Sequence, residues 1–186
     1  MTRQGRTDAQ IGRRTISQRR LEAAVDGIRG GVSFNAPLKD YTSFRIGGPA
    51  DVLVEPVDVD DVARLVRQTK AQKLPLFVVG GTNLLIRDKG IRGVVVHLGK
   101  LRAIREEPGS VLYAEGGVGM PTLIGYAIRH SLAGLEWAAG IPGTVAGCVV
   151  MNAGTRLGEM KDSVKAVRLV NRKGEILDIP ASEIPF

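Results

Sequence analysis

The sequence has little cysteine, few aromatic residues and no long apolar run. Cys148 is the one cysteine among 186 residues, which excludes an internal disulfide framework and a cysteine-based metal cluster and suits a reducing compartment. No apolar run reaches the roughly 18 residues of a membrane span, and the N-terminus lacks the apolar core of a secretion signal. We therefore expect a cytoplasmic protein with no membrane segment and no metal.

Acidic residues are also in deficit, and the deficit is concentrated at the N-terminus. The formal net charge is +7. Residues 1–30 hold seven arginines (3, 6, 13, 14, 19, 20 and 29) against three acidic residues, whereas the rest has 19 basic and 16 acidic residues. Because this basic arm has no aromatic residue, it is more typical of a solvated tail or helix than of a nucleic-acid reader. Nucleic acid is therefore not the expected partner.

The apolar content is sufficient for a globular fold. A hydrophobic fraction of 44% and a mean hydropathy of +0.03 are ordinary for a soluble domain. Residues 1–33 are expected to form a basic N-terminal arm with a short helix over residues 15–31, ended by Gly30 and Gly31. Residues 34–186 are expected to form the main domain.

Helical and strand patterns alternate along that domain. Strands are predicted over 50–56, 75–79 and 93–98, and paired strands over 101–117 and 164–179. A helix over 58–73 would begin after Asp58 as N-cap, and a second would begin near Pro121. Residues 35–50 are interpreted as extended and rich in turns. This mixture indicates an α+β fold.

Two glycine-rich turns are candidates for anion binding. In GIPGTVAG (140–147), the proline would occupy the first helical position, and Gly143 and Thr144 would open a helix whose free N–H groups attract phosphate. In GGTN (80–83), consecutive N–H groups are joined by the side-chain donors of Thr82 and Asn83. Two such turns fit the phosphates of a dinucleotide, or a phosphate and a ring. Two unrelated turns in a glycine-rich chain remain the alternative.

Better-known nucleotide motifs and catalytic groups are absent from the sequence. There is no GxxxxGKS/T loop, and GGVGMPT (116–122) lacks the third glycine of a dinucleotide fingerprint. His97 and His130 are interpreted as structural residues at the ends of a strand and a helix, and Cys148 as a buried, inert thiol. No residue stands out as a catalytic acid or base.

Four stretches together resemble one family. They are YTSFRIGGPADVLVEP (41–56), GGTNLLIRDKGIRGVVV (80–96), LEWAAGIPGTVAGCVVMNAG (135–154) and the EILDI hairpin before ASEIPF. The set resembles the UDP-N-acetylenolpyruvoylglucosamine reductases (UDP-N-acetylmuramate dehydrogenases) from about Phe34 onward. These are flavoenzymes of bacterial peptidoglycan synthesis, hence of cell-wall biogenesis, cell shape and cell division. The resemblance implies the α+β FAD-binding domain of the vanillyl-alcohol oxidase/p-cresol methylhydroxylase type, in two small α+β subdomains.

The resemblance also implies which residues hold FAD. Gly80 to Leu84 would bind the pyrophosphate through backbone N–H groups, Gly140 to Gly147 would lie against the cofactor, and Asn152 to Gly154 would line its flavin side. Arg45 belongs to the FRIGG motif expected nearby. The full expected set is Arg45, Ile46, Gly80, Gly81, Thr82, Asn83, Leu84, Gly140, Ile141, Pro142, Gly143, Thr144, Gly147, Asn152, Ala153 and Gly154.

In the family, NADPH reduces FAD, and the flavin then passes a hydride to a UDP-sugar enolpyruvyl ether. The family's catalytic arginine, serine and glutamate have no counterpart before Phe186, so the catalytic residues are unknown. We therefore expect the N-terminal, FAD-binding part of such a reductase, with little or no turnover by itself. Two departures are Val79 before Gly80 and Gly81, where the family usually has Gly-x-Gly, and Thr155-Arg156-Leu157 in place of Ala-Tyr-Gly.

Two other interpretations stay open. One is a non-catalytic flavin- or nucleotide-binding module whose basic arm engages a partner or nucleic acid. The other is a fragment whose exposed apolar surface drives association. The sequence leaves the oligomeric state undetermined.

Overall fold

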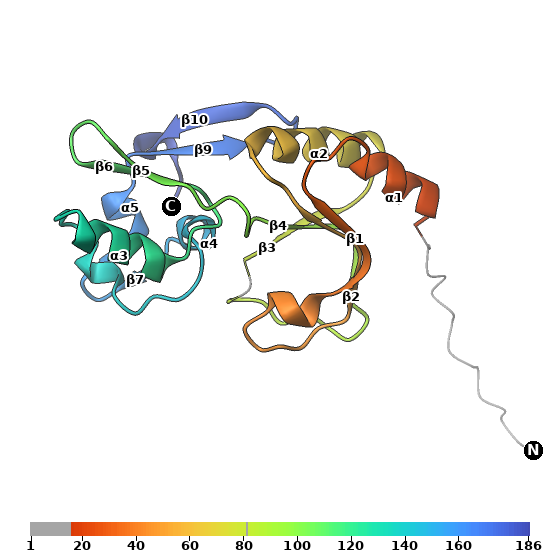
Figure 1. The fold of residues 1–186 in the computed structure, drawn as a ribbon, viewed down its shortest axis with the longest axis horizontal. Coiled ribbons are helices and arrows are strands. Elements are labelled where there is room, and N and C mark those ends of the chain that lie inside the picture. The colour runs from red at the N-terminus through yellow and green to blue at the C-terminus, as the bar shows by residue number, and fades with distance from the viewer. Residues whose placement is uncertain (1–15, 81) are drawn as a thin grey trace, which may run out of the picture.

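A four-stranded sheet organises the first half of the chain (Figure 1). The computed structural model describes residues 16–80 and 82–186. The strands are β1 (Gly31–Pro37), β2 (Pro49–Glu55), β3 (Leu76–Val79) and β4 (Ile91–His97), in the order β1-β2-β4-β3. β1 is antiparallel to β2, whereas β2 and β3 both run parallel to β4. The carboxyl ends of β2, β4 and β3 therefore meet at one edge of the sheet.

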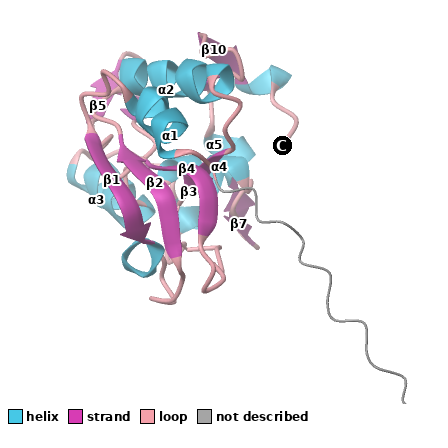
Figure 2. Ribbon diagram, turned by 90° about the vertical axis from the view of Figure 1, so that its right-hand side faces the viewer, coloured by secondary structure: helices cyan, strands magenta, loops and turns pink. Residues whose placement is uncertain are grey.

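Both faces of this sheet are covered. Helices α1 (Gln18–Val25) and α2 (Val59–Ala71) pack on one face, over alternate buried side chains of the central strands (Figure 2). The short helix η1 (Leu38–Tyr41) and the segment before β4 form a second core on the other face. The strands predicted over 50–56, 75–79 and 93–98 and the helix after Asp58 are confirmed, because central strands buried on both faces are continuously apolar.

The connection between α1 and β1 is fixed by a buried carboxylate. The Asp61 side chain, fully buried in the first turn of α2, accepts hydrogen bonds from the backbone N–H groups of Arg29 (3.1 Å), Gly30 (2.9 Å) and Val57 (3.3 Å). Asp58 caps α2 by accepting from the Asp61 N–H at 2.9 Å, as predicted. The segment before β1 is thus tied to the start of α2.

The second half has a core of its own. It contains the hairpin β5 (Ile104–Glu107) and β6 (Val111–Ala114), and the helices α3 (Met120–Arg129), η2 (Glu136–Ala138), α4 (Val145–Val150) and α5 (Met160–Ser163). A two-residue pair, β7 (Gly154–Thr155) and β8 (Gly158–Glu159), lies between α4 and α5. Met120, Trp137 and Cys148 are buried together, and the Trp137 indole N–H donates to Ser163 Oγ at 2.9 Å.

A last hairpin returns the chain to the first half. It consists of β9 (Ala166–Val170) and β10 (Ile176–Pro180), followed by η3 (Ala181–Glu183). Arg67 of α2 donates through Nη1 to the Gly174 carbonyl oxygen at 2.6 Å. This contact joins the hairpin turn to the helix that covers the sheet, and the predicted hairpin is confirmed.

Two predictions about the N-terminal region are corrected by the structure. The first helix ends at Val25 rather than at Gly30, because Asp26 has an extended backbone and Gly27 a φ of +67°. The expected boundary between residues 33 and 34 falls inside β1, so the described residues before it belong to the same fold. Residues 1–15 of the basic arm lie outside the described part. None of the described helices is long and apolar enough to cross a membrane, and no cluster of metal-ligating side chains occurs in the described residues.

Candidate functional site

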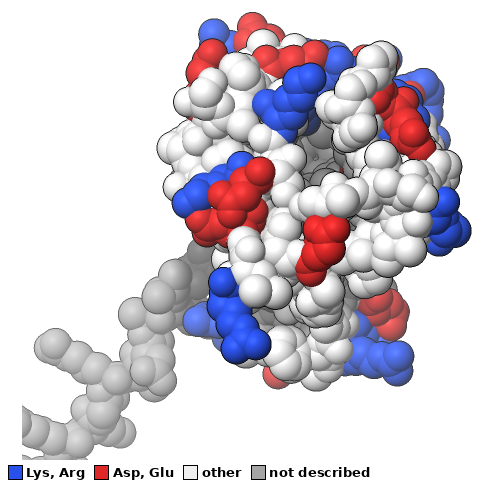
Figure 3. All heavy atoms as spheres, turned by 90° about the vertical axis from the view of Figure 1, so that its left-hand side faces the viewer, with Lys and Arg blue, Asp and Glu red and all other residues white. Residues whose placement is uncertain are grey.

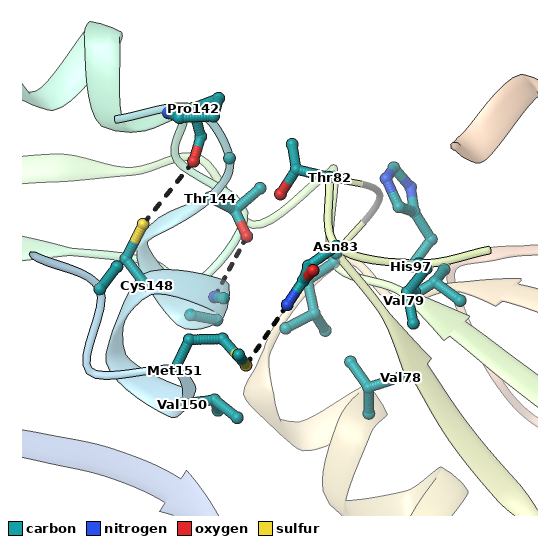
Figure 4. Close-up of a pocket in the computed structure, with 18 residues that line it drawn as sticks. Val78, Val79, Thr82, Asn83, His97, Pro142, Thr144, Cys148, Val150 and Met151 are labelled. Carbon is teal, nitrogen blue, oxygen red and sulfur yellow. Dashed lines mark hydrogen bonds between the residues drawn. The ribbon is translucent and has the colours of Figure 1, made fainter. Parts of the chain in front are cut away.

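A cleft of about 480 Å³ separates the carboxyl edge of the sheet from α4 (Figure 4). One wall comes from the ends of β3 and β4 and the segments that follow them, and the other comes from residues 142–153. Ligands of open α/β sheets bind beyond the carboxyl ends of parallel strands, where this cleft lies. The lining residues are Val78, Val79, Gly80, Thr82, Asn83, Leu84, His97, Leu98, Gly99, Pro142, Gly143, Thr144, Ala146, Gly147, Cys148, Val150, Met151 and Ala153.

The first wall contains consecutive backbone N–H groups that have no described acceptor. Gly80 directly follows the last residue of β3, and Thr82 and Asn83 are exposed beside it. No described residue accepts a hydrogen bond from the backbone N–H of Thr82, Asn83 or Leu84. These groups follow one another in the turn, the arrangement in which successive amides bind an anion. Gly81, part of the predicted site, lies outside the described residues.

The start of α4 corrects a prediction made for GIPGTVAG. The helix begins at Val145 with Thr144 as N-cap, so Pro142 precedes the helix and does not occupy its first position. The Val145 and Ala146 N–H groups donate to the carbonyl oxygens of Val118 (2.8 Å) and Gly116 (3.0 Å). The Gly147 N–H donates to Thr144 Oγ1 at 3.3 Å. The first amides of this helix are therefore used inside the fold, because a segment remote in the sequence supplies their acceptors.

The amides just before the helix differ from those of its first turn. The N–H groups of Gly143 and Thr144 donate to no described residue, although the Gly143 carbonyl oxygen accepts from the Met120 N–H at 2.9 Å. At this turn, the amides left available for an anion are therefore those of Gly143 and Thr144 instead of those of the helix N-terminus.

Small residues bring the two walls close together. Gly143 has a φ of +106°, and a Cβ there would lie 2.9 Å from Thr82 Oγ1. A Cβ on Gly80 would have Thr144 Oγ1 at 3.8 Å as its one neighbour within 4 Å, so the space in front of Gly80 is open. Asn83 Nδ2 lies 3.9 Å from Met151 Sδ across the cleft (Figure 4). The two glycine turns found in the sequence thus face each other across a narrow cleft.

Among the described residues, the lining is mostly apolar and contains no Lys, Arg, Asp or Glu. Val78, Leu98, Val150 and Met151 supply apolar surface suited to a planar ring. Burial raises the pKa of the Cys148 thiol, so the thiol is neutral at physiological pH, as its interpretation as an inert buried group requires. An anion in this cleft would be held by backbone amides, hydroxyl groups and the imidazole of His97.

The structure brings nine of the sixteen predicted residues into the lining and places most others beside it. Asn152 donates through Nδ2 to Glu159 Oε2 at 2.9 Å and accepts from the Lys161 N–H at 3.0 Å, so its side chain holds the β7–α5 connection. Arg45 and Ile46 are exposed in the turn after η1. Gly140, Ile141 and Gly154 flank the lining segments without lining the cleft. The nine in the lining are Gly80, Thr82, Asn83, Leu84, Pro142, Gly143, Thr144, Gly147 and Ala153.

Several lining residues were missed by sequence reasoning. His97, interpreted as structural, lines the cleft together with Leu98 and Gly99. The signal that could have found them is that β3 and β4 are parallel neighbours, which places their carboxyl ends side by side. The other missed residues are Val78, Val79, Cys148, Val150 and Met151, whereas Ala146 falls within the predicted range 140–147.

Comparison with known proteins identifies the family. The FAD binding domain family matches residues 50–180. This range contains both glycine turns and the strands from β2 to β10, apart from Pro49 at the start of β2. The chain belongs to the FAD binding domain family. The two turns and the parallel strand edge are accordingly features of a flavin-binding fold.

The chain is also similar to particular enzymes. It is 44% identical over 158 residues to the UDP-N-acetylenolpyruvoylglucosamine reductase of Caldanaerobacter subterraneus subsp. tengcongensis, covering 84% of this chain and 52% of that protein. Its structure is similar to the crystal structure of the UDP-N-acetylenolpyruvylglucosamine reductase of Thermus caldophilus, with a TM-score of 0.68 and a sequence identity of 34%. The match covers 85% of this chain and 55% of that one. The chain therefore spans about half the length of the reductases it matches.

A more distant structure has the same fold. The 6-hydroxy-D-nicotine oxidase of Arthrobacter nicotinovorans matches 85% of this chain and 37% of its own, with 21% identity and a TM-score of 0.66. The α+β FAD-binding fold of the vanillyl-alcohol oxidase type, expected from the sequence, is confirmed.

Proposed function

We propose that this chain is the FAD-binding portion of an NADPH-dependent flavoenzyme that reduces UDP-N-acetylglucosamine enolpyruvate to UDP-N-acetylmuramate in the cytoplasm. The observation that carries the proposal is the cleft across which the two glycine turns face each other, so closely that a Cβ on Gly143 would lie 2.9 Å from Thr82 Oγ1. The 44% identity to a reductase of that substrate class supports the choice of reaction.

The described residues fit a dinucleotide such as FAD. The unpartnered N–H groups of Thr82, Asn83 and Leu84, with those of Gly143 and Thr144, would hold the pyrophosphate, and the open space at Gly80 admits it close to the backbone. The apolar lining would take the rings and exclude water from them. When bound, FAD supplies the hydride-transfer chemistry, and this chain positions it.

We propose that binding of NADPH and of the UDP-sugar substrate, and catalysis itself, need residues other than 1–186. The resemblance provides no counterpart here for the family's catalytic arginine, serine and glutamate, and the reductases that match are about twice as long as this chain. We therefore propose that the chain alone binds FAD with little or no turnover. NADPH, the UDP-sugar enolpyruvyl ether and the catalytic residues would meet only in an enzyme of the relatives' length.

The visible absorption spectrum of the purified chain, before and after incubation with FAD and desalting, tests the proposal. Flavin bands that stay with the protein are the expected result. A colourless protein after desalting, with no saturable binding in a fluorescence titration of FAD, would contradict it. Fusion to the missing half of a related reductase should then give NADPH-dependent reduction of the substrate, whereas the unfused chain should not.

The module with a nucleic-acid-binding arm is less well supported. Arg20 Nε donates to the Gln72 carbonyl oxygen at 3.1 Å, and Arg29 Nη2 lies 2.6 Å from Asp58 Oδ2. Two of the seven arginines are thus engaged in holding α1 and β1 to α2. The face in Figure 3 carries interspersed basic and acidic side chains, with no continuous basic surface over the described residues visible there. Salt-sensitive binding lost on deletion of residues 1–15 would revive this alternative.

A further inference from the structure

A row of residues at the edge of the sheet leads into the cleft. The parallel strands β2, β4 and β3 end at Glu55, His97 and Val79, and His97 pairs in register with Val79. Gly80 follows Val79 and starts the turn in which the amides of Thr82, Asn83 and Leu84 have no described acceptor. The His97 side chain, 25% exposed, therefore stands beside the start of that turn (Figure 4).

Three neighbouring residues contact the imidazole of His97 and fix its position. Its Nδ1 lies 3.4 Å from Glu55 Oε1. Its ring meets the Tyr41 ring edge-on, with centroids 4.9 Å apart and planes at 71°. A Cβ on the buried Gly99 would lie 2.4 Å from His97 Cε1 and 2.9 Å from His97 Nδ1. The imidazole therefore occupies the space that a side chain at position 99 would fill. These contacts come from different segments and hold the ring in one place.

The contact with Glu55 determines what the ring can offer to a ligand. Because Nδ1–H donates to the carboxylate, Nε2 is the nitrogen left to interact with other groups, and it donates when the ring is protonated. Lys100 belongs to the same neighbourhood, because a Cβ on Gly31 would lie 3.2 Å from Lys100 Nζ and 3.5 Å from Glu55 Oε2. Burial and the charge of Glu55 raise the pKa of Tyr41, so its phenol stays neutral.

We propose that His97 binds the diphosphate of the cofactor, supplying the one positive charge that the described lining of the cleft can carry, and that Glu55 is its positioning residue. The diphosphate is the group concerned because His97 lies next to Gly80, where the turn that offers backbone amides begins. This inference rests on the proposed function. It adds a side-chain contact to a site otherwise made of amides and hydroxyl groups.

Titration of three ligands tests the proposal on the purified chain. FAD and ADP contain the diphosphate, whereas riboflavin has the flavin ring without it. His97→Leu should weaken FAD and ADP binding roughly tenfold or more, as loss of a hydrogen bond to a charged group does, and should leave riboflavin binding unchanged. His97→Gln, which keeps a donor, should bind ADP more tightly than His97→Leu. His130→Leu, at the end of α3 outside the cleft lining, is the matched control and should change none of the three.

The positioning role of Glu55 has its own readouts. Glu55→Gln should weaken ADP binding in the wild-type background and have no further effect in His97→Leu. Wild-type affinity for ADP should be weaker at high pH than at low pH, because the contact requires the protonated imidazole, and His97→Gln should lose this dependence. Tyr41, Glu55 and Lys100 are the other titratable groups that face this cluster.

Each unfavourable outcome has a distinct meaning. Unchanged FAD and ADP affinity in His97→Leu would overturn the proposal, and so would an equal loss of riboflavin affinity, which would show a packing role. A wild-type chain that binds none of the three ligands would overturn the proposed function and this inference together. If His97→Leu does not fold, the comparison of His97→Gln with Glu55→Gln over pH decides the question.

Discussion

Two glycines with nearly the same φ angle differ in what lies in front of them. Gly143 has a φ of +106° and Gly134 a φ of +108°, and side chains are strained at both. A Cβ on Gly143 would lie 2.9 Å from Thr82 Oγ1, whereas a Cβ on Gly134 would have no neighbour within 4 Å. The pair therefore separates backbone strain from contact across the cleft.

We predict that Gly143→Ala and Gly134→Ala lower the free energy of unfolding by a similar amount, about 1–2 kcal/mol. Gly143→Ala should in addition weaken FAD binding at least tenfold, because Thr82 must move and carries part of the cleft wall with it. Thermal unfolding and a fluorescence titration of FAD measure the two effects. Equal FAD affinity in both variants would show that the approach of Thr82 to Gly143 does not shape the site.

At the scale of elements, Asp61 joins α1 and β1 to α2. Burial would raise the pKa of Asp61, but hydrogen bonds from the Arg29 and Val57 N–H groups and the Arg29 guanidinium outweigh it, so the pKa lies below its ordinary value. The folded state therefore prefers the ionised carboxylate. Its stabilising contribution is complete above the unfolded-state pKa of about 3.9 and is lost as pH falls through the lower pKa of the folded state.

We predict that Asp61→Asn lowers the free energy of unfolding by about 2 kcal/mol near pH 7, because an amide cannot accept from all three N–H groups. The difference in the free energy of unfolding between Asp61→Asn and wild type should shrink as pH falls below about 4 and through the lower folded-state pKa of Asp61, where the carboxylate takes up its proton. Urea unfolding at several pH values measures both. Asp60→Asn, at the exposed neighbour in the same helical turn, should cost only a few tenths of a kcal/mol. A pH-independent difference would contradict the role of the ionised carboxylate.

Elements with local signals were predictable from the sequence, and those fixed by distant partners were not. α2 has an N-cap, apolar periodicity and a basic last turn within its own residues. β1 contains Pro37 and, at φ +51°, Asn35, so it has the composition of a turn. Its pairing with β2, with Phe34 opposite Val52 and Ala36 opposite Ala50, makes it a strand.

The same distinction explains what was found of the site. The glycine turns at Gly80 and Gly143 carry their own signal, because successive glycines and small polar residues have few other uses. The true start of α4 depends on the carbonyl oxygens of Gly116 and Val118, which no local pattern indicates. His97 ends an apolar strand, and it lines the cleft because β3 lies beside β4, a pairing that the sequence near His97 does not indicate.

At the scale of the whole molecule, the cleft is the place where two separately packed halves meet. The sheet has cores on both of its faces, and the second half packs around Met120 and Trp137. Across the cleft, a Cβ on Gly143 would lie 2.9 Å from Thr82 Oγ1, and Asn83 Nδ2 lies 3.9 Å from Met151 Sδ. A ligand that fills the cleft would therefore add contacts to both halves at once.

We predict that FAD slows amide hydrogen exchange in both walls, at residues 82–84 and at residues 143–151, and raises the unfolding temperature of the chain. At a hundred times the dissociation constant, mass action alone stabilises the folded state by about 2.7 kcal/mol. Hydrogen-exchange mass spectrometry with and without FAD measures the first effect, and the α1 peptide, remote from the cleft lining, is the internal control. Protection limited to residues 82–84 would mean that the cofactor binds the sheet edge alone. In that case the α4 wall would need the rest of a reductase to close over it, and the approach of Gly143 to Thr82 would not be the feature that forms the site.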